Sequence, residues 1–380
     1  MEVLPLAIFR FVRRFVRSMA PTMSKISPGY SGKCQTLWAC SALAGLFLTV
    51  SMAGAAPYRI IVVSPDRSQS HIHSVDAAIR SIPSHSHQPV VIVIRPGIYH
   101  QRIIVPPHSP PITFMGINPA DTILVDSRIA YQKGENGKPI GTFRTASTWI
   151  RSNNFSAVNI TFANDVGISG NGYDGQALAI RVDGDRAVFD HCRFIGWQDT
   201  ILLNKNRQYF DHCRILGSVD FIFGNATAFF NHCHIVCLGY GCVTAPRTPE
   251  ASPFGFVFDH CRITSYAKPG DTWLGRPWGP YASSIFMRCH LPASLNKNLF
   301  QHWNDKRSPE TARFGVYKCS VLSPSKVPAW IKQFTRKEAS KITTATVLRG
   351  SDGWNPHKVI QNLSREFKSI ASHGPGRHAG

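Results

Sequence analysis

Two aspartates occupy equivalent positions in a sequence repeat, and they are the residues best placed to do chemistry. Asp199 closes the segment 190–199, and Asp220 closes the segment 211–220, which repeats it from a shared Asp-His-Cys-Arg start. Self-similarity at a fixed period indicates a solenoid whose repeats stack on one another. If the repeats stack in register as parallel strands, equivalent residues lie about 4.8 Å apart. The two carboxyl groups then form a close pair, which favours acid–base or nucleophilic chemistry.

Three further polar residues occur in the same part of the chain. Gln198 directly precedes Asp199, and Gln176 lies one repeat earlier in a Gly-Gln-Ala-Leu-Ala segment. Arg276 lies downstream in a Leu-Gly-Arg-Pro-Trp segment. A single glutamine or arginine of this kind is usually an ordinary surface or packing residue. Their occurrence together with a repeat-aligned acid pair makes them candidate catalytic residues.

The elements that must position these side chains are short strands. Weaker copies of the repeat follow at 231–235, 259–263 and 288–291, with variable intervals between them. Their cores are short, rich in Phe and Ile, and bounded by Gly and Asn, which favours strands over helices. Strands of constant length joined by loops of variable length are typical of a parallel β-helix. We therefore predict an all-β fold, a parallel β-helix.

The two ends of the solenoid carry different signals. His73–Pro83 predicts a short amphipathic helix with Ser74 as its N-cap, placed to cover the open N-terminal end. Val90–Ile94 reads as a buried strand. Thr335–Glu338 has a capping-box pattern and predicts the start of a C-terminal helical segment. Residues 357–380 are polar, and we expect a loosely held tail there.

The first 56 residues have the features of an export signal rather than of a folded domain. Leu37–Val50 is mostly apolar and precedes the small residues Ala53–Ala56, an arrangement typical of a signal peptide and its cleavage site. The apolar run is too short for a transmembrane helix. Translation can begin at Met1 or at Met23. We expect an extension plus signal peptide at 1–56, a single domain at 57–356, and a secreted or periplasmic protein without a membrane anchor after cleavage.

The net charge of +20 points to anionic partners. Residues 1–56 carry six of the 42 Lys and Arg and one of the 22 acidic residues, so the rest of the chain has a net charge of +15. For an exported protein, an acidic polysaccharide or a negatively charged cell surface is a better match than nucleic acid. The alternative is that the charge only aids solubility.

Eight cysteines remain after residue 56, and they allow two interpretations. An exported protein can keep disulfides, and Cys213–Cys233 and Cys237–Cys242 are the candidate pairs. Alternatively, the repeated cysteine is a small buried residue in a stacked row. A zinc site from the repeated His-Cys pairs is disfavoured, because neighbouring residues of a strand point to opposite faces. We expect the cysteines to point inward and the histidines outward.

Four segments together resemble the signature blocks of the pectin methylesterase (pectinesterase) family. They are Gly-Gln-Ala-Leu-Ala at 175–179, Gly-Trp-Gln-Asp-Thr at 196–200, Gly-Ser-Val-Asp-Phe-Ile-Phe-Gly-Asn-Ala at 217–226 and Leu-Gly-Arg-Pro-Trp at 274–278. The resemblance runs from about Pro57 to Pro356, and the segment 244–248 is more similar to bacterial members. It implies a right-handed parallel β-helix that hydrolyses methyl esters of polygalacturonate (homogalacturonan, the pectin backbone) to methanol and pectate.

The resemblance also implies a role for each candidate. Asp220 matches the nucleophile, and Asp199 matches the general acid that later acts as base. Arg276 is expected to hold Asp220 ionised, because an opposite charge lowers the pKa of an acid. Gln176 and Gln198 match the oxyanion donors. The expected substrate contacts are Trp278, Phe223, Trp197 and Thr142. The family implies no metal and no cofactor, and we expect a monomer.

Three other functions remain open from the sequence. One is a relative that cleaves a different ester, such as a thioester. Another is a glycoside hydrolase or lyase on the same scaffold, since paired carboxylates also suit glycoside hydrolysis. The third is a non-catalytic polysaccharide-binding or adhesion solenoid. The sequence contains no Gly-x-Ser-x-Gly motif, which disfavours a serine esterase.

Overall fold

A computed structural model describes residues 58–166, 175–303, 310–320 and 327–373, with side chains up to residue 366. The chain divides into two compact units, Met1–Pro57 and Tyr58–Gly380, and only the second contains described residues. The expected extension and signal peptide at 1–56 therefore lie outside the described residues. None of the helices described here has the length and hydropathy needed to cross a bilayer.

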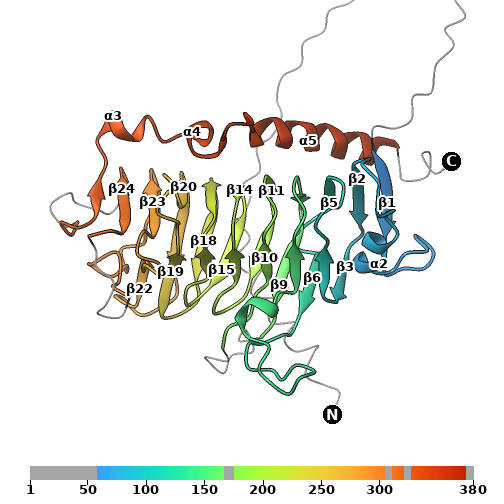
Figure 1. The fold of residues 1–380 in the computed structure, drawn as a ribbon, viewed down its shortest axis with the longest axis horizontal. Helices are drawn as coiled ribbons and strands as arrows, with labels where there is room; N and C mark the ends of the chain where they lie inside the picture. The colour runs from blue at the N-terminus through green and yellow to red at the C-terminus, as the bar shows by residue number, and fades with distance from the viewer. Residues whose placement is uncertain (1–57, 167–174, 304–309, 321–326, 374–380) are drawn as a thin grey trace, which may run out of the picture. The chain divides into compact units, whose positions relative to one another are not determined.

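Three sheets of parallel strands run along the long axis of the second unit (Figure 1). Sheet A contains, in order, β1 (Arg59–Val63), β2 (Val90–Ile94), β5 (Ile112–Gly116), β8 (Ser156–Val158), β11 (Ala187–Asp190), β14 (Arg207–Asp211), β17 (Thr227–Asn231), β20 (Phe256–Asp259), β23 (Ser283–Met287), β24 (Arg313–Tyr317) and β25 (Lys332–Gln333). Sheet B contains β3 (Gly97–His100), β6 (Thr122–Asp126), β9 (Thr161–Asn164), β12 (Arg193–Ile195), β15 (Arg214–Gly217), β18 (His234–Cys237) and β21 (Arg262–Ser265). Sheet C contains β4 (Ile103–Val105), β7 (Thr148–Ile150), β10 (Ile180–Val182), β13 (Ile201–Leu203), β16 (Ile222–Gly224), β19 (Gly241–Pro246) and β22 (Thr272–Gly275).

From β2 to β22 each coil contributes one strand to each sheet, whereas β1 and β23–β25 belong to sheet A alone. Successive coils stack in register. In one coil the chain passes through β11, β12 and β13, and in the next through β14, β15 and β16. Phe189 of β11 pairs with Phe210 of β14, and that residue pairs in turn with Phe230 of β17. The predicted parallel β-helix is confirmed, and the repeat in the sequence corresponds to the stacking of its coils.

The interior is filled by rows of identical side chains. The phenylalanine row of sheet A has ring centroids 4.4–4.8 Å apart, in near-parallel stacks. A second row consists of cysteines, all buried, whose thiols donate to backbone carbonyls. All eight described cysteines are free, so the candidate disulfides Cys213–Cys233 and Cys237–Cys242 are not formed. The stacked row was the correct alternative for the repeated cysteines, each of which donates to the carbonyl two residues before it in its own coil.

A short helix covers the N-terminal end of the solenoid, as the sequence predicts. The helix α2 (Val75–Arg80) begins at Ser74, whose side chain accepts a hydrogen bond from the backbone of Ala77 at 3.0 Å. Val75, Ala78 and Ile79 are buried in the core. The helix packs against β1, β2 and β4, and so shields the first coils from solvent.

Three helices lie along the outer face of sheet A (Figure 1). They are α3 (Arg336–Ala339), α4 (Thr344–Leu348) and α5 (Pro356–His373). The predicted capping box is present at α3, where Thr335 and Glu338 exchange hydrogen bonds. The prediction of a loose tail from 357 is wrong up to residue 373. Val359, Ile360 and Leu363 share one face of α5, and they pack against the apolar outer face of sheet A or are buried.

Candidate active site

A pocket of about 660 Å³ opens on the outer face of sheet C. It gathers the two aspartates, both glutamines and the arginine singled out from the sequence, together with aromatic side chains. The lining residues are Ile140, Gly141, Thr142, Phe143, Arg144, Gln176, Gln198, Asp199, Asp220, Phe223, Ala245, Arg276, Trp278 and Trp303.

Strand register places the two aspartates on neighbouring coils. Ile201 of β13 pairs with Ile222 of β16, and the same offset relates Asp199 to Asp220. The backbone N–H of Asp199 donates to the carbonyl of Val219 at 3.0 Å, which ties the two turns together. Both aspartates stand at the turn from sheet B to sheet C and have positive φ values of 62° and 51°. Aspartate adopts this conformation more easily than most residues, so the turn directs both side chains into the pocket.

Asp220 is held by the guanidinium group of Arg276. Nε of Arg276 lies 2.9 Å from Oδ1 and 3.2 Å from Oδ2, and its Nη2 donates to Oδ2 at 2.6 Å. A flat face of the guanidinium group stacks on the ring of Trp303, with Cζ 4.5 Å from the ring centroid. A two-point ion pair of this kind orients the carboxylate as well as stabilising its charge. The expected Asp220–Arg276 contact is present.

Burial raises the pKa of both acids. For Asp199, which is 8% exposed, burial and then the charge of Asp220 raise the pKa well above its usual value, and Arg276 opposes them. For Asp220, which is 5% exposed, burial raises the pKa and Arg276 lowers it in part. We expected Arg276 to lower the pKa of Asp220 outright. The net direction is the opposite, because loss of hydration outweighs the ion pair. The stronger rise at Asp199 leaves Asp220 as the acid that ionises first.

The two glutamines come from adjacent coils. Gln176 precedes β10 and pairs with Gln198 as an isolated bridge between neighbouring coils. Gln198 is buried, and its Oε1 has no hydrogen-bond partner among the described residues. No contact in the described part of the chain therefore holds that end of the amide. An unpaired buried amide oxygen costs roughly 1–3 kcal/mol of stability. Both side-chain amides line the same pocket as the acid pair.

Aromatic rings form one wall of the pocket. Phe223 of β16 comes three residues after Asp220, and its ring centroid is 5.9 Å from that of Trp278. Trp278 also faces Phe143, at 6.3 Å, and its ring stacks under the guanidinium group of Arg247, at 5.2 Å. Thr142 and Phe143 belong to the 3-10 turn η1 (Thr142–Arg144). Flat apolar surfaces next to polar groups suit the binding of a sugar ring.

The structure places one predicted substrate contact elsewhere and adds others. Trp197 does not line the pocket, and its ring lies against Gly239. Phe143 and Trp303 were not predicted from the sequence. Phe143 is 45% exposed, on a segment between β6 and β7 that lacks any repeat pattern. An aromatic residue in this insertion, which also contains Tyr131, is the signal that was available.

The described residues contain one group of three potential metal ligands, and it lies outside this pocket. The group is Asp190, His191 and His212, at the turn from sheet A to sheet B. The charged side chains that line the pocket are Asp199, Asp220, Arg144 and Arg276. The chemistry of the pocket is therefore that of a carboxylate pair, two amides and two guanidinium groups.

Comparisons with known proteins give one family. The family model described as Pectinesterase matches residues 60–351. Pectinesterase 31 of Arabidopsis thaliana is 38% identical over 292 residues, which cover 75% of this chain and 90% of that protein. Pectinesterase QRT1 of Arabidopsis thaliana is 36% identical over 307 residues, with 78% of each chain covered.

Solved structures show the same relationship. Pectin methylesterase from carrot superposes with a TM-score of 0.70 and 28% identity, covering 81% of this chain and 97% of that one. PemA, the pectin methylesterase of Erwinia chrysanthemi, gives a TM-score of 0.68 and 27% identity, covering 80% and 99%. A pectin methylesterase in complex with a hexasaccharide gives the same values.

Proposed function

The chain belongs to the pectinesterase family and removes methyl esters from pectin, and we propose that Asp220 is the nucleophile of this reaction and Asp199 its acid and base. The proposal rests on one observation. Arg276 holds Asp220 through a two-point ion pair, and a second buried acid, Asp199, lies beside it on the neighbouring coil. The difference between their environments separates the roles of the two carboxyl groups.

The first half of the reaction forms an acyl-enzyme. The Asp220 carboxylate attacks the ester carbonyl carbon, and the carbonyl oxygen becomes an oxyanion. The amide groups of Gln176 and Gln198 donate to that oxyanion, which is worth roughly 3 kcal/mol per donor in other enzymes. The tetrahedral intermediate collapses when Asp199 protonates the methoxy oxygen. Methanol leaves, and a galacturonyl anhydride remains on Asp220.

The second half returns the enzyme to its starting state. Asp199, now ionised, takes a proton from water, and the resulting hydroxide attacks the acyl carbon. The bond to Asp220 breaks, and Asp220 is again a carboxylate facing Arg276. Asp199 ends the cycle protonated, the state that its raised pKa favours. Each step is supplied by side chains that line the pocket, so we propose hydrolysis without a metal or cofactor.

The substrate we propose is methyl-esterified homogalacturonan, bound along the aromatic wall. Phe223, Trp278 and Thr142 border the aspartates in the same pocket and are the proposed contacts. We propose that Phe143 takes the role that the sequence assigned to Trp197, since Phe143 lines the pocket and faces Trp278. We also propose that the protein is exported, as a secreted or periplasmic monomer.

One paired assay tests the reaction class and the nucleophile together. Highly methylated pectin is incubated with the protein, and methanol and reducing ends are measured in parallel. We expect methanol without new reducing ends, because an ester and not a glycosidic bond is cleaved. Asp220→Asn should lower methanol release by roughly 10⁴-fold or more. The matched control is Asp211→Asn, the next buried acid of the same coil, which lies outside the pocket. New reducing ends without methanol, or an Asp220→Asn variant with substantial activity, would contradict the proposal.

A further inference from the structure

Four histidines form a stacked row at the turn from sheet A to sheet B. His191, His212, His232 and His260 each follow the last residue of a sheet A strand. Neighbouring ring centroids are 5.1, 5.2 and 5.1 Å apart, and the rings are parallel within 6°. All four have φ between 49° and 52°. We call this row the histidine ladder, and its side chains point outward, away from the cysteine row.

A carboxylate oxygen lies beside Nδ1 in three of these rings. Nδ1 of His191 lies 2.6 Å from Oδ1 of Asp190, and Nδ1 of His212 lies 3.1 Å from Oδ2 of Asp211. His260 has the same relationship to Asp259 at 3.1 Å. A ring nitrogen and a carboxylate oxygen are both metal ligands, and a proton between them must leave before an ion can take its place.

The carboxylates along the ladder differ in what else they contact. Asp259 is already neutralised by Arg288, whose Nε donates at 2.8 Å. Asp211 accepts from the amide of Asn231 at 2.7 Å and from the hydroxyl of Tyr209 at 3.3 Å. Asp190 has no arginine, amide or hydroxyl partner among the described residues. A cation is therefore attracted more strongly to the Asp190 end of the ladder than to the end where Arg288 neutralises Asp259.

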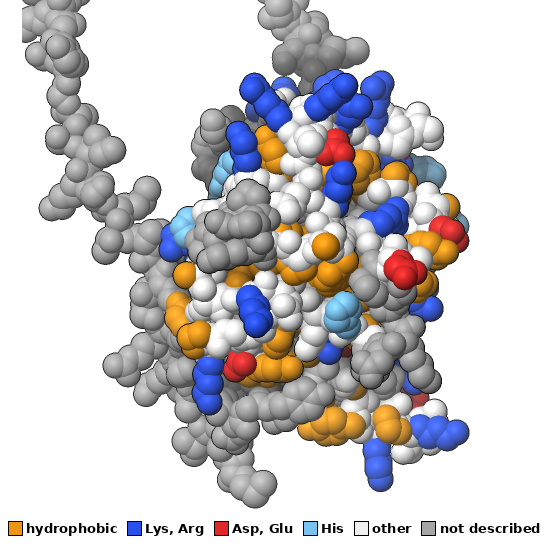
Figure 2. Space-filling model, turned by 90° about the vertical axis from the view of Figure 1, so that its left-hand side faces the viewer, with side chains coloured by type: hydrophobic (Ala, Val, Ile, Leu, Met, Phe, Trp, Pro, Cys, Tyr) orange, Lys and Arg blue, Asp and Glu red, His pale blue; other side chains and the backbone are white. Residues whose placement is uncertain are grey.

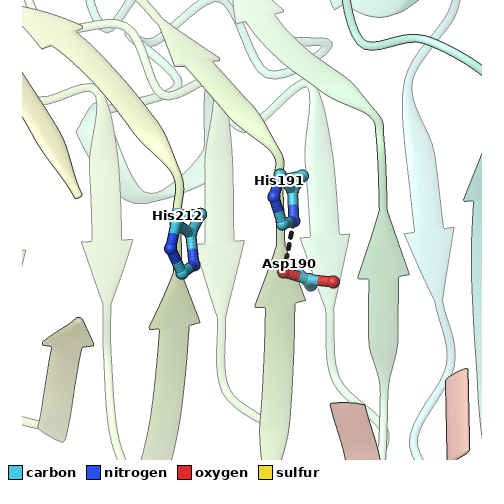
Figure 3. A group of neighbouring side chains, drawn as sticks. All are labelled: Asp190, His191 and His212. Carbon is cyan, nitrogen blue, oxygen red and sulfur yellow. Dashed lines mark hydrogen bonds and ion pairs between the residues drawn. The ribbon is translucent and has the colours of Figure 1, made fainter. Parts of the chain in front are cut away.

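At that end the potential ligand atoms already lie close together (Figure 3). One nitrogen from each of His191 and His212 and one oxygen of Asp190 lie within 4.8 Å of one another. A zinc ion binds nitrogen and oxygen at about 2.0–2.2 Å, so its ligands stand roughly 3–4 Å apart. The two histidine side chains are 57% and 48% exposed, which leaves them room to rotate by the remaining ångström.

We propose that Asp190, His191 and His212 bind one divalent transition-metal ion of the zinc class, with water completing the coordination. The sequence disfavours zinc only at adjacent His-Cys pairs, and the cysteines do point inward. The ligands instead come from equivalent positions on two stacked coils. The site lies at the turn from sheet A to sheet B, whereas the aspartates of the pocket lie at the turn from sheet B to sheet C. The ion would connect two coils and would take no part in ester hydrolysis.

Calorimetric titration of the whole protein with zinc chloride tests the proposal. We expect one site that is lost in each of His191→Asn, His212→Asn and Asp190→Asn, because each change removes a ligand. The matched control is His260→Asn, a change in the same ladder that should leave the affinity unchanged. Asparagine tolerates positive φ, so the backbone is retained at the three histidine positions. The proposal is overturned if wild type binds no more zinc than the His191→Asn/His212→Asn double variant, or if His260→Asn weakens binding equally.

A second measurement needs no variant. Diethyl pyrocarbonate modifies exposed imidazoles, and the modified residues can be identified by peptide mass mapping. Zinc should protect His191 and His212 at least several-fold while His260 still reacts. Equal protection of all three residues, or none, would contradict a site at the Asp190 end.

Discussion

Asp199 combines deep burial with a charge that the reaction requires only part of the time. Its carboxyl group is 8% exposed, and burial together with Asp220 raises its pKa well above the usual range. An acid whose pKa is higher in the folded than in the unfolded chain binds more protons when folded. The free energy of unfolding therefore falls as pH rises above the unfolded pKa, near 3.8. The residue that serves catalysis weakens the fold at neutral pH.

This predicts that Asp199→Asn is inactive but more stable than the wild type at pH 7. Asparagine retains the shape, tolerates φ of 62° and removes the buried charge. We expect a gain of about 1–2 kcal/mol at pH 7 that disappears below the unfolded pKa of the acid. Thermal unfolding measured from pH 3 to pH 7 shows the dependence. Asp211→Asn, which replaces a carboxylate that accepts hydrogen bonds from Tyr209 and Asn231, should show no such gain. A variant less stable than wild type at pH 7 would refute this account.

At the residue scale, the sequence predicts contacts between residues at equivalent repeat positions better than contacts with residues outside the repeat. The shared offset of Asp199 and Asp220 follows directly from strand register. Nothing in the spacing places Arg276 against Asp220, and that contact came only from the family resemblance. The net direction of the Asp220 pKa was missed, because the burial of a side chain cannot be obtained from its neighbours in sequence.

At the element scale, stability depends on the in-register rows inside the solenoid. Phe230 lies in the middle of the phenylalanine row, 4.6 Å from Phe210 and 4.4 Å from Phe258, and is fully buried. Each ring contacts its equivalents on the coils before and after it. A change at one position is therefore felt by two neighbouring coils.

We predict that Phe230→Ala lowers the free energy of unfolding by about 3–5 kcal/mol, because it leaves a cavity between two stacked rings. Urea denaturation followed by circular dichroism measures the change. Phe143→Ala is the control, since that ring is 45% exposed on η1 and its removal should leave stability within about 0.5 kcal/mol of wild type. Equal losses in the two variants would mean that the interior row does not stabilise the fold.

Elements that belong to the sequence repeat or carry a capping pattern were predictable from the sequence, and the other elements were not. The strands of the repeat and the capped helix α2 follow patterns in the chain itself. The helix α5 was missed because its few apolar residues are surrounded by polar ones and are meaningful only against the apolar outer face of sheet A. The turn η1, which supplies Thr142 and Phe143 to the pocket, belongs to an insertion whose path no repeat defines.

At the scale of the whole molecule, positive charge is the dominant surface property. The chain carries 42 Lys and Arg against 22 acidic residues. On the face in Figure 2, Lys and Arg side chains clearly outnumber Asp and Glu. Pectin gains negative charge with each methyl ester removed. Attraction between enzyme and polymer should therefore increase as the reaction proceeds.

We predict that salt weakens binding to low-methyl pectin on the order of tenfold between about 50 and 500 mM, since exposed charges are screened over this range. Michaelis constants for methanol release report the effect, and kcat should change little. Fully methylated pectin, which is nearly neutral, is the control and should show little salt dependence. Equal salt dependence for both polymers would remove the role proposed for the positive surface.

The Asp220–Arg276 ion pair also has a consequence for the order of events during biosynthesis. Its partners are 56 positions apart, and Trp278 and Trp303 follow later still. Ribosomes deliver the chain from its N-terminus, so the nascent protein holds both acids before the cation that orients one of them exists. A polypeptide interrupted anywhere before Arg276 lacks this clamp. Competence for ester cleavage thus arises late in translation, and incomplete products are inert.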